Sequence, residues 1–136
     1  MAYWLMKSEP DAFSWDDLLR DGSTEWDGVR SAEAARNLRA MAPGDEALFY
    51  HSNVGLEAVG IMRVTRAWQP EGPDGKWASV EVKPVEPLPR PVTLKAMKAE
   101  PRLAAMKMIR QSRLSVSPVS AAEWRIILQM AGATER

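Results

Sequence analysis

The chain has no cysteine and only one histidine among its 136 residues. Without cysteine there can be no disulfide, no cysteine nucleophile and no thiolate metal site, and a lone histidine is too little for a zinc centre made of protein ligands. We therefore expect neither a metal nor a cofactor.

Long apolar runs are also absent. No stretch approaches 18 apolar residues, and the first residues, Met1 to Trp4, lack the basic and then apolar order of a signal peptide. We expect a soluble, cytoplasmic protein without membrane contact. A length of 136 residues with 46% hydrophobic content suits one domain, residues 1–136, around one core.

There is no excess of charge of either sign, since 18 basic residues balance 18 acidic ones. This balance argues against strong sequence-independent affinity for duplex DNA. Two interpretations of the local clustering are open: a basic strip for a phosphate backbone, or a solvated surface of mixed sign. The basic residues that gather in the last third are Lys95, Lys98, Arg102, Lys107, Arg110 and Arg113.

Strand-like segments occupy the start and the middle of the chain. Alternating apolar residues and β-branched or aromatic content predict strands at residues 3–7, 47–52, 58–68, 78–85 and 114–116. Residues 69–75 are rich in proline and glycine, which predicts a hairpin loop. Prolines at near-alternate positions from Pro84 to Pro91 predict that this segment leaves the sheet.

Helical signals lie between these strands and after them. Ser14, Thr93 and Ser120 are suitable N-caps, and Pro101 is suitable as a first helical residue. The predicted helices are residues 15–19, 32–41, 94–99, a short one from Pro101, and 121–130. A mainly antiparallel sheet flanked by helices, an α+β fold, is the expected architecture.

Three separate segments place large aromatic residues beside polar groups. They are residues 3–10, 26–30 and 48–53. Aromatic rings can stack a flat heterocycle, and neighbouring donors and acceptors can read its edge. The pattern predicts a pocket for a base.

Each aromatic candidate also has a structural interpretation. Trp26 lies in a polar, glycine-containing stretch, so its indole either forms a pocket wall or closes the edge of the core. Period-two alternation puts Tyr50 and Ser52 on one face of a strand and His51 on the other, and a strand-end histidine is often bonded to backbone.

The polar candidates are open to two interpretations as well. Ser8 and Glu9 precede Pro10, so they either project into one opening or form a charged turn in solvent. Arg30 and Arg113 either contact phosphates or form structural ion pairs with Asp27 and other acids.

Together with residues 113–116, the three segments closely resemble the EVE domain family, a relative of the PUA and YTH domains, from about residue 3 to about residue 128. The resemblance implies a PUA-like pseudo-barrel and a non-catalytic reader of a modified base in DNA or RNA, typically a modified cytosine. The base-binding residues that it implies are Lys7, Ser8, Glu9, Trp26, Val29, Arg30, Tyr50, His51, Ser52, Asn53, Arg113 and Ser115.

The sequence departs from the family pattern just after Arg30. Ser31, Ala32 and Glu33 stand where the family usually has asparagine, an aromatic residue and glutamine. The segment before Trp77 is also shorter than in many relatives. These departures weaken the expectation that these segments contact DNA. They do not affect the expectation of a pocket.

Two other functions are compatible with the residues. An enzyme acting on a nucleobase or nucleoside could use Glu9 or His51 as proton carrier and Ser8 or Ser52 as nucleophile, although no known catalytic motif orders them. A protein-interaction module could hold a peptide or a methylammonium group in an aromatic cleft. Oligomeric state is not specified by the sequence.

Overall fold

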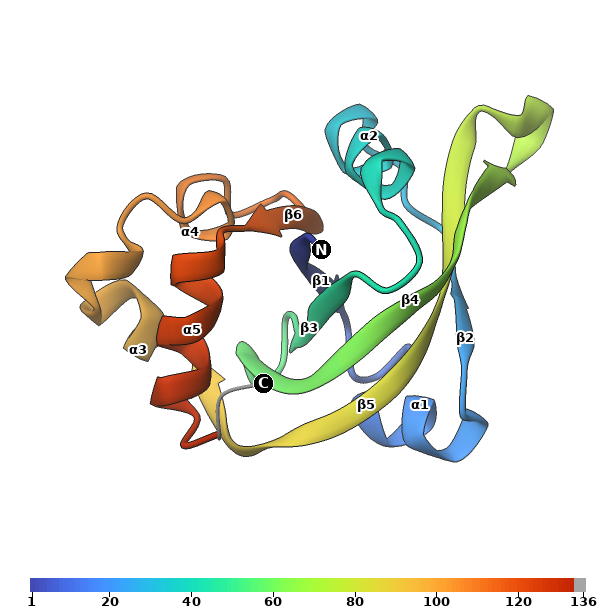
Figure 1. Cartoon of the computed structure of the whole chain (residues 1–136). Coiled ribbons are helices and arrows are strands. Elements are labelled where there is room, and N and C mark those ends of the chain that lie inside the picture. The colour runs from blue at the N-terminus through green and yellow to red at the C-terminus, as the bar shows by residue number, and fades with distance from the viewer. Residues whose placement is uncertain (134–136) are drawn as a thin grey trace.

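The computed structural model describes residues 1–133. Their strands form one six-stranded sheet in the order β2-β5-β4-β3-β1-β6 (Figure 1). Only β1 and β3 are parallel, and the other neighbours are antiparallel. The strands are β1 (Tyr3–Ser8), β2 (Thr24–Trp26), β3 (Glu46–His51), β4 (Glu57–Glu71), β5 (Trp77–Thr93) and β6 (Val116–Val119).

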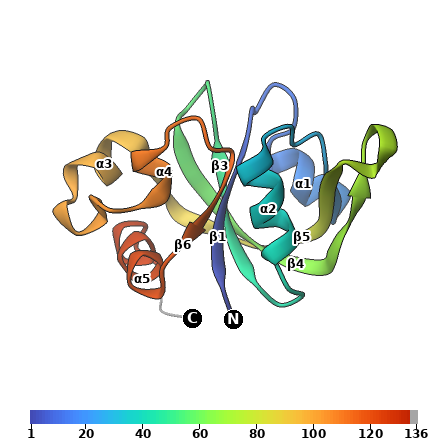
Figure 2. The same ribbon diagram turned by 90° about the horizontal axis from the view of Figure 1, so that it is seen from above.

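Helices cover both faces of the sheet. Figure 2 shows α1 and α2 on one side of β1 and β3, and α3, α4 and α5 on the other. The helices are α1 (Trp15–Asp21), α2 (Ala32–Ala40), α3 (Leu94–Ala99), α4 (Lys107–Arg110) and α5 (Ala121–Met130), with 3-10 turns η1 (Pro73–Gly75) and η2 (Pro101–Leu103). This is the expected α+β fold of mainly antiparallel strands, and its strand order does not close into a barrel.

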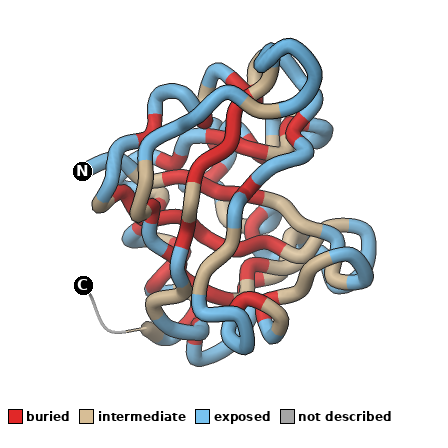
Figure 3. The backbone as a smooth tube through the Cα atoms, turned by 90° about the vertical axis from the view of Figure 1, so that its right-hand side faces the viewer, coloured by how far each residue is buried: buried red, intermediate tan, exposed pale blue. Residues whose placement is uncertain are grey.

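The central strands are buried on both faces, as the red tube of Figure 3 shows. Successive side chains of a strand point to opposite faces. Leu48 and Tyr50 of β3 therefore pack in the cluster beneath α3 and α5, whereas Ala47 and Phe49 pack in the cluster beneath α1 and α2. The prediction that Tyr50 and His51 lie on opposite faces of the strand is confirmed, since His51 contacts Phe49.

The predicted caps begin the helices. Ser14 and Ser120 form capping boxes with Asp17 and Glu123, and Thr93 accepts a hydrogen bond from the backbone N–H of Ala96. These bonds satisfy amide donors that the first helical turn leaves free. The helices α3 and α5 have the predicted bounds.

The structure corrects the prediction for the proline-rich segment, which remains in β5 as far as Thr93. Pro84 and Pro87 lie opposite Met62 and Gly60 of β4, with register shifts between the pairs. Proline is tolerated there because β2 pairs only with Val80–Val82, so the later part of β5 has a free edge.

A second correction concerns Trp26, for which the sequence predicts a flexible polar stretch. It ends the short strand β2 at the edge of the sheet, opposite Val80. Three residues are too few for a visible alternation, so the sequence gives no strand signal there. Among residues 1–133, no helix is long and apolar enough to cross a membrane.

Candidate functional site

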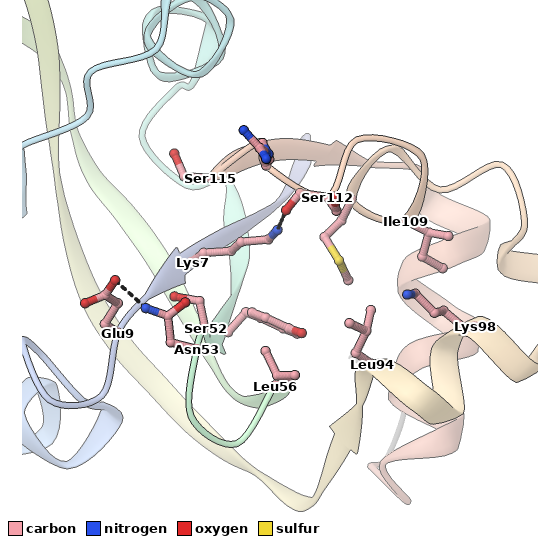
Figure 4. Close-up of a pocket in the computed structure, with 13 residues that line it drawn as sticks. Lys7, Glu9, Ser52, Asn53, Leu56, Leu94, Lys98, Ile109, Ser112 and Ser115 are labelled. Carbon is pink, nitrogen blue, oxygen red and sulfur yellow. Dashed lines mark hydrogen bonds between the residues drawn. The ribbon is translucent and has the colours of Figure 1, made fainter.

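A cavity of about 600 Å³ opens between the ends of β1 and β3 and the helices α3 and α4 (Figure 4). We call it the central cavity. Its polar lining comes from Lys7, Glu9, Ser52, Asn53, Lys98, Ser112, Arg113 and Ser115. Its apolar lining comes from Tyr50, Leu56, Leu94, Met108 and Ile109. The volume lies within the usual range of ligand sites.

Lys7 and Tyr50 form the strand side of the cavity, as partners in the parallel β1–β3 register. The Lys7 Nζ donates to the carbonyl oxygen of Ser112 at 2.7 Å and lies 5.8 Å from the centre of the Tyr50 ring. Burial lowers the pKa of Lys7 from its ordinary value. The cavity thus has an anchored ammonium group beside an aromatic ring.

Tyr50 is 2% exposed. Burial, and next the negative charge of Glu57, raise the pKa of Tyr50 to about 12. Its phenol therefore stays protonated at neutral pH and can donate a hydrogen bond. Within residues 1–133 the hydroxyl has no hydrogen-bond partner, so it is available to a ligand.

A carboxylate–amide pair stands at the mouth of the cavity. The Asn53 Nδ2 donates to Glu9 Oε1 at 2.6 Å, which joins the turn after β1 to the turn after β3 (Figure 4). Asn53 has a φ of 65°, a left-handed conformation that asparagine adopts more readily than most residues. The pair leaves one amide N–H, the amide oxygen and a carboxylate oxygen for the edge of a heterocycle.

The opposite wall is mainly apolar. Leu94 and Lys98 stand one turn apart on α3, and Met108 and Ile109 come from α4. The backbone N–H of Leu94 donates to the carbonyl of Leu56 at 2.8 Å, which ties α3 to the turn between β3 and β4. A flat ligand would therefore meet polar groups on one side and aliphatic groups on the other.

A second, smaller hollow of about 220 Å³ lies beside Lys7, and we call it the Trp26 hollow. Its lining consists of Lys7, Ser8, Phe13, Thr24, Glu25, Trp26 and Asp27. Trp26 is only 7% exposed and meets Phe49 edge to face, with ring centres 5.4 Å apart. Its indole belongs to the core and shows one side to the hollow.

The Trp26 hollow is acidic, because Glu25 and Asp27 outnumber Lys7. The guanidinium of Arg66 binds both carboxylate oxygens of Glu25, and the Ser79 hydroxyl donates to one of them at 2.7 Å. These bonds, chiefly that from Arg66, hold the pKa of Glu25 below its ordinary value. The carboxylate therefore stays charged and is held in an ion pair with Arg66.

Ser8 and His51 already have structural partners. The Ser8 hydroxyl donates to the carbonyl of Phe13 at 2.6 Å, and the backbone N–H of Trp15 donates to His51 Nε2 at 3.1 Å. Burial lowers the pKa of His51, and a neutral ring is what an accepting Nε2 requires. His51 meets Phe49 edge to face, on the β3 face away from Tyr50.

Val29 and Arg30 also serve the structure. Val29 is buried in the cluster beneath α1 and α2. Arg30 forms a two-bond ion pair with Glu71, at 2.7 and 3.0 Å, and its guanidinium lies over the Trp77 ring. Of the two interpretations of Arg30, the structural ion pair is present, with Glu71 rather than Asp27 as partner.

The structure thus gathers seven of the twelve candidates in the central cavity. They are Lys7, Glu9, Tyr50, Ser52, Asn53, Arg113 and Ser115. Ser8 and Trp26 border the Trp26 hollow, so the rings of Trp26 and Tyr50 face two separate hollows that share Lys7.

Sequence reasoning missed the wall from α3 and α4. In the sequence Lys98 is only one member of a basic cluster, and Met108 and Ile109 have the pattern of core residues. Both are indeed packed against the apolar cluster, and they border the cavity as well. Their place in the cavity becomes visible only when α3 and α4 pack beside the ends of β1 and β3.

Comparisons with known proteins agree with this fold. The model of the EVE domain matches residues 2–130. Thymocyte nuclear protein 1 of Mus musculus is 32% identical over 164 residues, which cover 94% of this chain and 73% of the mouse protein.

Two solved structures are similar over nearly their whole length. Rpa0253 from Rhodopseudomonas palustris has a TM-score of 0.94 at 46% identity, covering 100% of this chain and 97% of that chain. Human THYN1, in complex with 5-methylcytosine containing DNA, has a TM-score of 0.91 at 29% identity, covering 99% of this chain and 100% of that chain. The chain therefore belongs to the EVE domain family.

Proposed function

We propose that the chain is a single, non-catalytic reader domain that binds a modified base of DNA or RNA in the central cavity. The observation that carries the proposal is the pairing of a hydrogen-bonding edge, Glu9 and Asn53, with an apolar wall across a cavity of about 600 Å³. The human THYN1 complex with 5-methylcytosine containing DNA supports a modified cytosine as ligand.

Recognition divides between the two sides. Asn53 and Glu9 offer a donor and acceptors to the base edge, with the Tyr50 hydroxyl as a further donor. A methyl group on the base would lie against Leu56, Leu94 or Met108. Burying one methyl group is worth about 0.8 kcal/mol, roughly a fourfold preference. Most base discrimination therefore has to come from the polar side.

The rim of the cavity suits the phosphates beside the base. Lys98 and Arg113 are exposed there, and Lys7 contributes the anchored ammonium. This positive rim, together with the larger volume of the central cavity, is the reason to place the base there and not in the Trp26 hollow.

Asn53→Ala tests the proposal. We expect the affinity for an oligonucleotide with a single 5-methylcytosine to fall about tenfold or more, since a well-placed pair of base contacts is worth about 1–3 kcal/mol. Gln129→Ala removes an exposed amide from α5 and serves as the matched control. Equal affinities for Asn53→Ala, Gln129→Ala and the unchanged chain would show that the base does not bind in this cavity.

The state of Ser8 and His51 supports the absence of catalysis. Of the candidate proton carriers and nucleophiles, the Ser8 hydroxyl and the His51 Nε2 are already engaged with Phe13 and Trp15. We expect no turnover when a library of modified nucleosides is incubated with the chain. Product formation that is lost in His51→Ala would favour the enzyme instead.

We also propose that the protein is located in the cytoplasm. The word nuclear in the name of the mouse relative describes that protein.

A further inference from the structure

Two further hollows adjoin the central cavity, one on each side. The α3 hollow, about 510 Å³, shares Leu56, Leu94 and Lys98 with the cavity and adds Lys95. The Arg110 hollow, about 400 Å³, shares Ser112 and Arg113 with the cavity and adds Arg110. Because the shared residues place both hollows directly beside the central cavity, we call the three together the groove.

The groove is positively charged in a chain whose formal net charge is zero. Five cations line it: Lys7, Lys95, Lys98, Arg110 and Arg113. The two carboxylates in it have partners, since Glu9 accepts from Asn53 and Glu33 accepts from Gln111 at 3.1 Å, with Lys107 Nζ 4.0 Å away. An extended polyanion is the ligand class that matches this distribution.

The groove also carries aliphatic groups between its cations. Leu56 and Leu94 lie beside Lys95 and Lys98, and Leu114 lies beside Arg110 and Arg113. A duplex presents mainly phosphates and sugars to such a surface, whereas an unpaired strand also presents the faces of its bases.

We propose that the groove binds a single strand of nucleic acid across the site of the read base. Lys95 and Lys98 bind phosphates on one side of that base, and Arg110 and Arg113 bind phosphates on the other. The inference rests on the proposed function for the position of the base, and it adds the strandedness of the ligand and the path of its backbone.

The path separates two groups of basic residues in the last third of the sequence. Lys95, Lys98, Arg110 and Arg113 line the groove and have no ion-pair partner among residues 1–133. Arg102 lies outside the three hollows and is bound to Glu100 at 3.0 Å. Arg102→Ala therefore removes the same charge and provides a matched control.

The test measures fluorescence anisotropy of a labelled single-stranded nonamer with a central 5-methylcytosine, and of the unmethylated nonamer, at several salt concentrations. The variants are Lys95→Ala/Lys98→Ala, Arg110→Ala and Arg102→Ala. Each phosphate contact contributes roughly 0.7 to the salt slope for single strands, so the double variant should lose about 1.4 in slope and Arg110→Ala about 0.7. Both nonamers should weaken by the same factor, about threefold per cation at low salt.

A labelled 5-methylcytidine nucleoside provides the second arm, because it has no flanking phosphates. Its affinity should be unchanged in Arg110→Ala, because Arg110 lines the groove but lies outside the central cavity. The proposal is overturned if the groove variants behave like Arg102→Ala with the nonamers. The methylated nonamer is also measured as a duplex, and the single-strand part is overturned if the groove variants weaken only duplex binding. Equal binding of both nonamers by the unchanged chain would instead contradict modified-base reading and leave the backbone path standing.

Discussion

The central cavity and the Trp26 hollow share Lys7 but differ in almost every other respect. The first is larger, has a positive rim and borders Tyr50, and the second is small, acidic and bordered by a core tryptophan. The two rings face different hollows because Tyr50 and Trp26 pack on opposite faces of the sheet. Both rings are buried in core clusters, and the face of the sheet decides which hollow each of them borders.

Trp26→Ala should have the largest effect, and on stability rather than on binding alone. Removal of a buried indole leaves a cavity beside Phe49, so the free energy of unfolding should fall by about 3–5 kcal/mol in denaturant titration. Trp68→Ala is the control, because Trp68 is 39% exposed and should cost about 1 kcal/mol or less. Equal costs for the two variants would show that Trp26 is not a core residue.

Gly60→Ala should reveal how tightly the face of Trp26 is packed. A Cβ at Gly60 would lie 2.5 Å from the indole of Trp15, which is buried. Such overpacking typically costs about 1–3 kcal/mol. Ser112→Ala, at the exposed rim of the central cavity, should change stability by no more than about 0.5 kcal/mol. Thermal unfolding of both variants checks the difference, and an unaffected Gly60→Ala would contradict it.

Lys7→Met tests the residue that the two hollows share. The substitution keeps most of the side-chain length and removes the ammonium group, so affinity for a single-stranded oligonucleotide should fall about threefold at low salt, with a salt slope about 0.7 smaller. Lys83→Met removes an exposed charge on β5, outside both hollows, and should change neither value. A Lys7→Met chain that binds like the Lys83→Met chain would exclude Lys7 from phosphate contact.

His51→Gln should produce the smallest effect, a change in pH dependence. Burial lowers the pKa of His51 in the folded chain, so the unfolded chain takes up a proton first as the pH falls below about 6.5. The contribution of His51 to stability is thus complete above that pH and decreases below it. A glutamine amide can still accept from Trp15 without titrating in this range, so unfolding curves should show a weaker decrease between about pH 7 and pH 5 for His51→Gln. Parallel decreases would contradict the neutral-acceptor role.

Local signals predicted the parts of the fold that depend on neighbouring residues. Ser14, Thr93 and Ser120 specify helix starts through their own hydrogen bonds, and alternation in β3 divides Tyr50 from Phe49. The persistence of β5 through its prolines depends instead on the missing neighbour along its edge. The sequence of β5 alone does not indicate which strand pairs with it or how long that strand is.

The candidate site was predictable in part for the same reason. Glu9 and Asn53 follow strands that were predicted, and the parallel pairing of β1 with β3 brings their turns together. Leu94, Met108 and Ser112 come from helices and a loop that lie far from these strands in the sequence. They reach the cavity only in the folded chain. Their side chains look like packing or surface residues until that contact is made.

A crystal structure of the chain with a short single-stranded oligonucleotide containing 5-methylcytosine is the most direct measurement. We predict that the methylated base lies in the central cavity, with its edge within hydrogen-bond distance of Asn53 and its methyl group against the aliphatic wall. A base stacked on Trp26 between Glu25 and Asp27, with the central cavity occupied only by solvent, would contradict it.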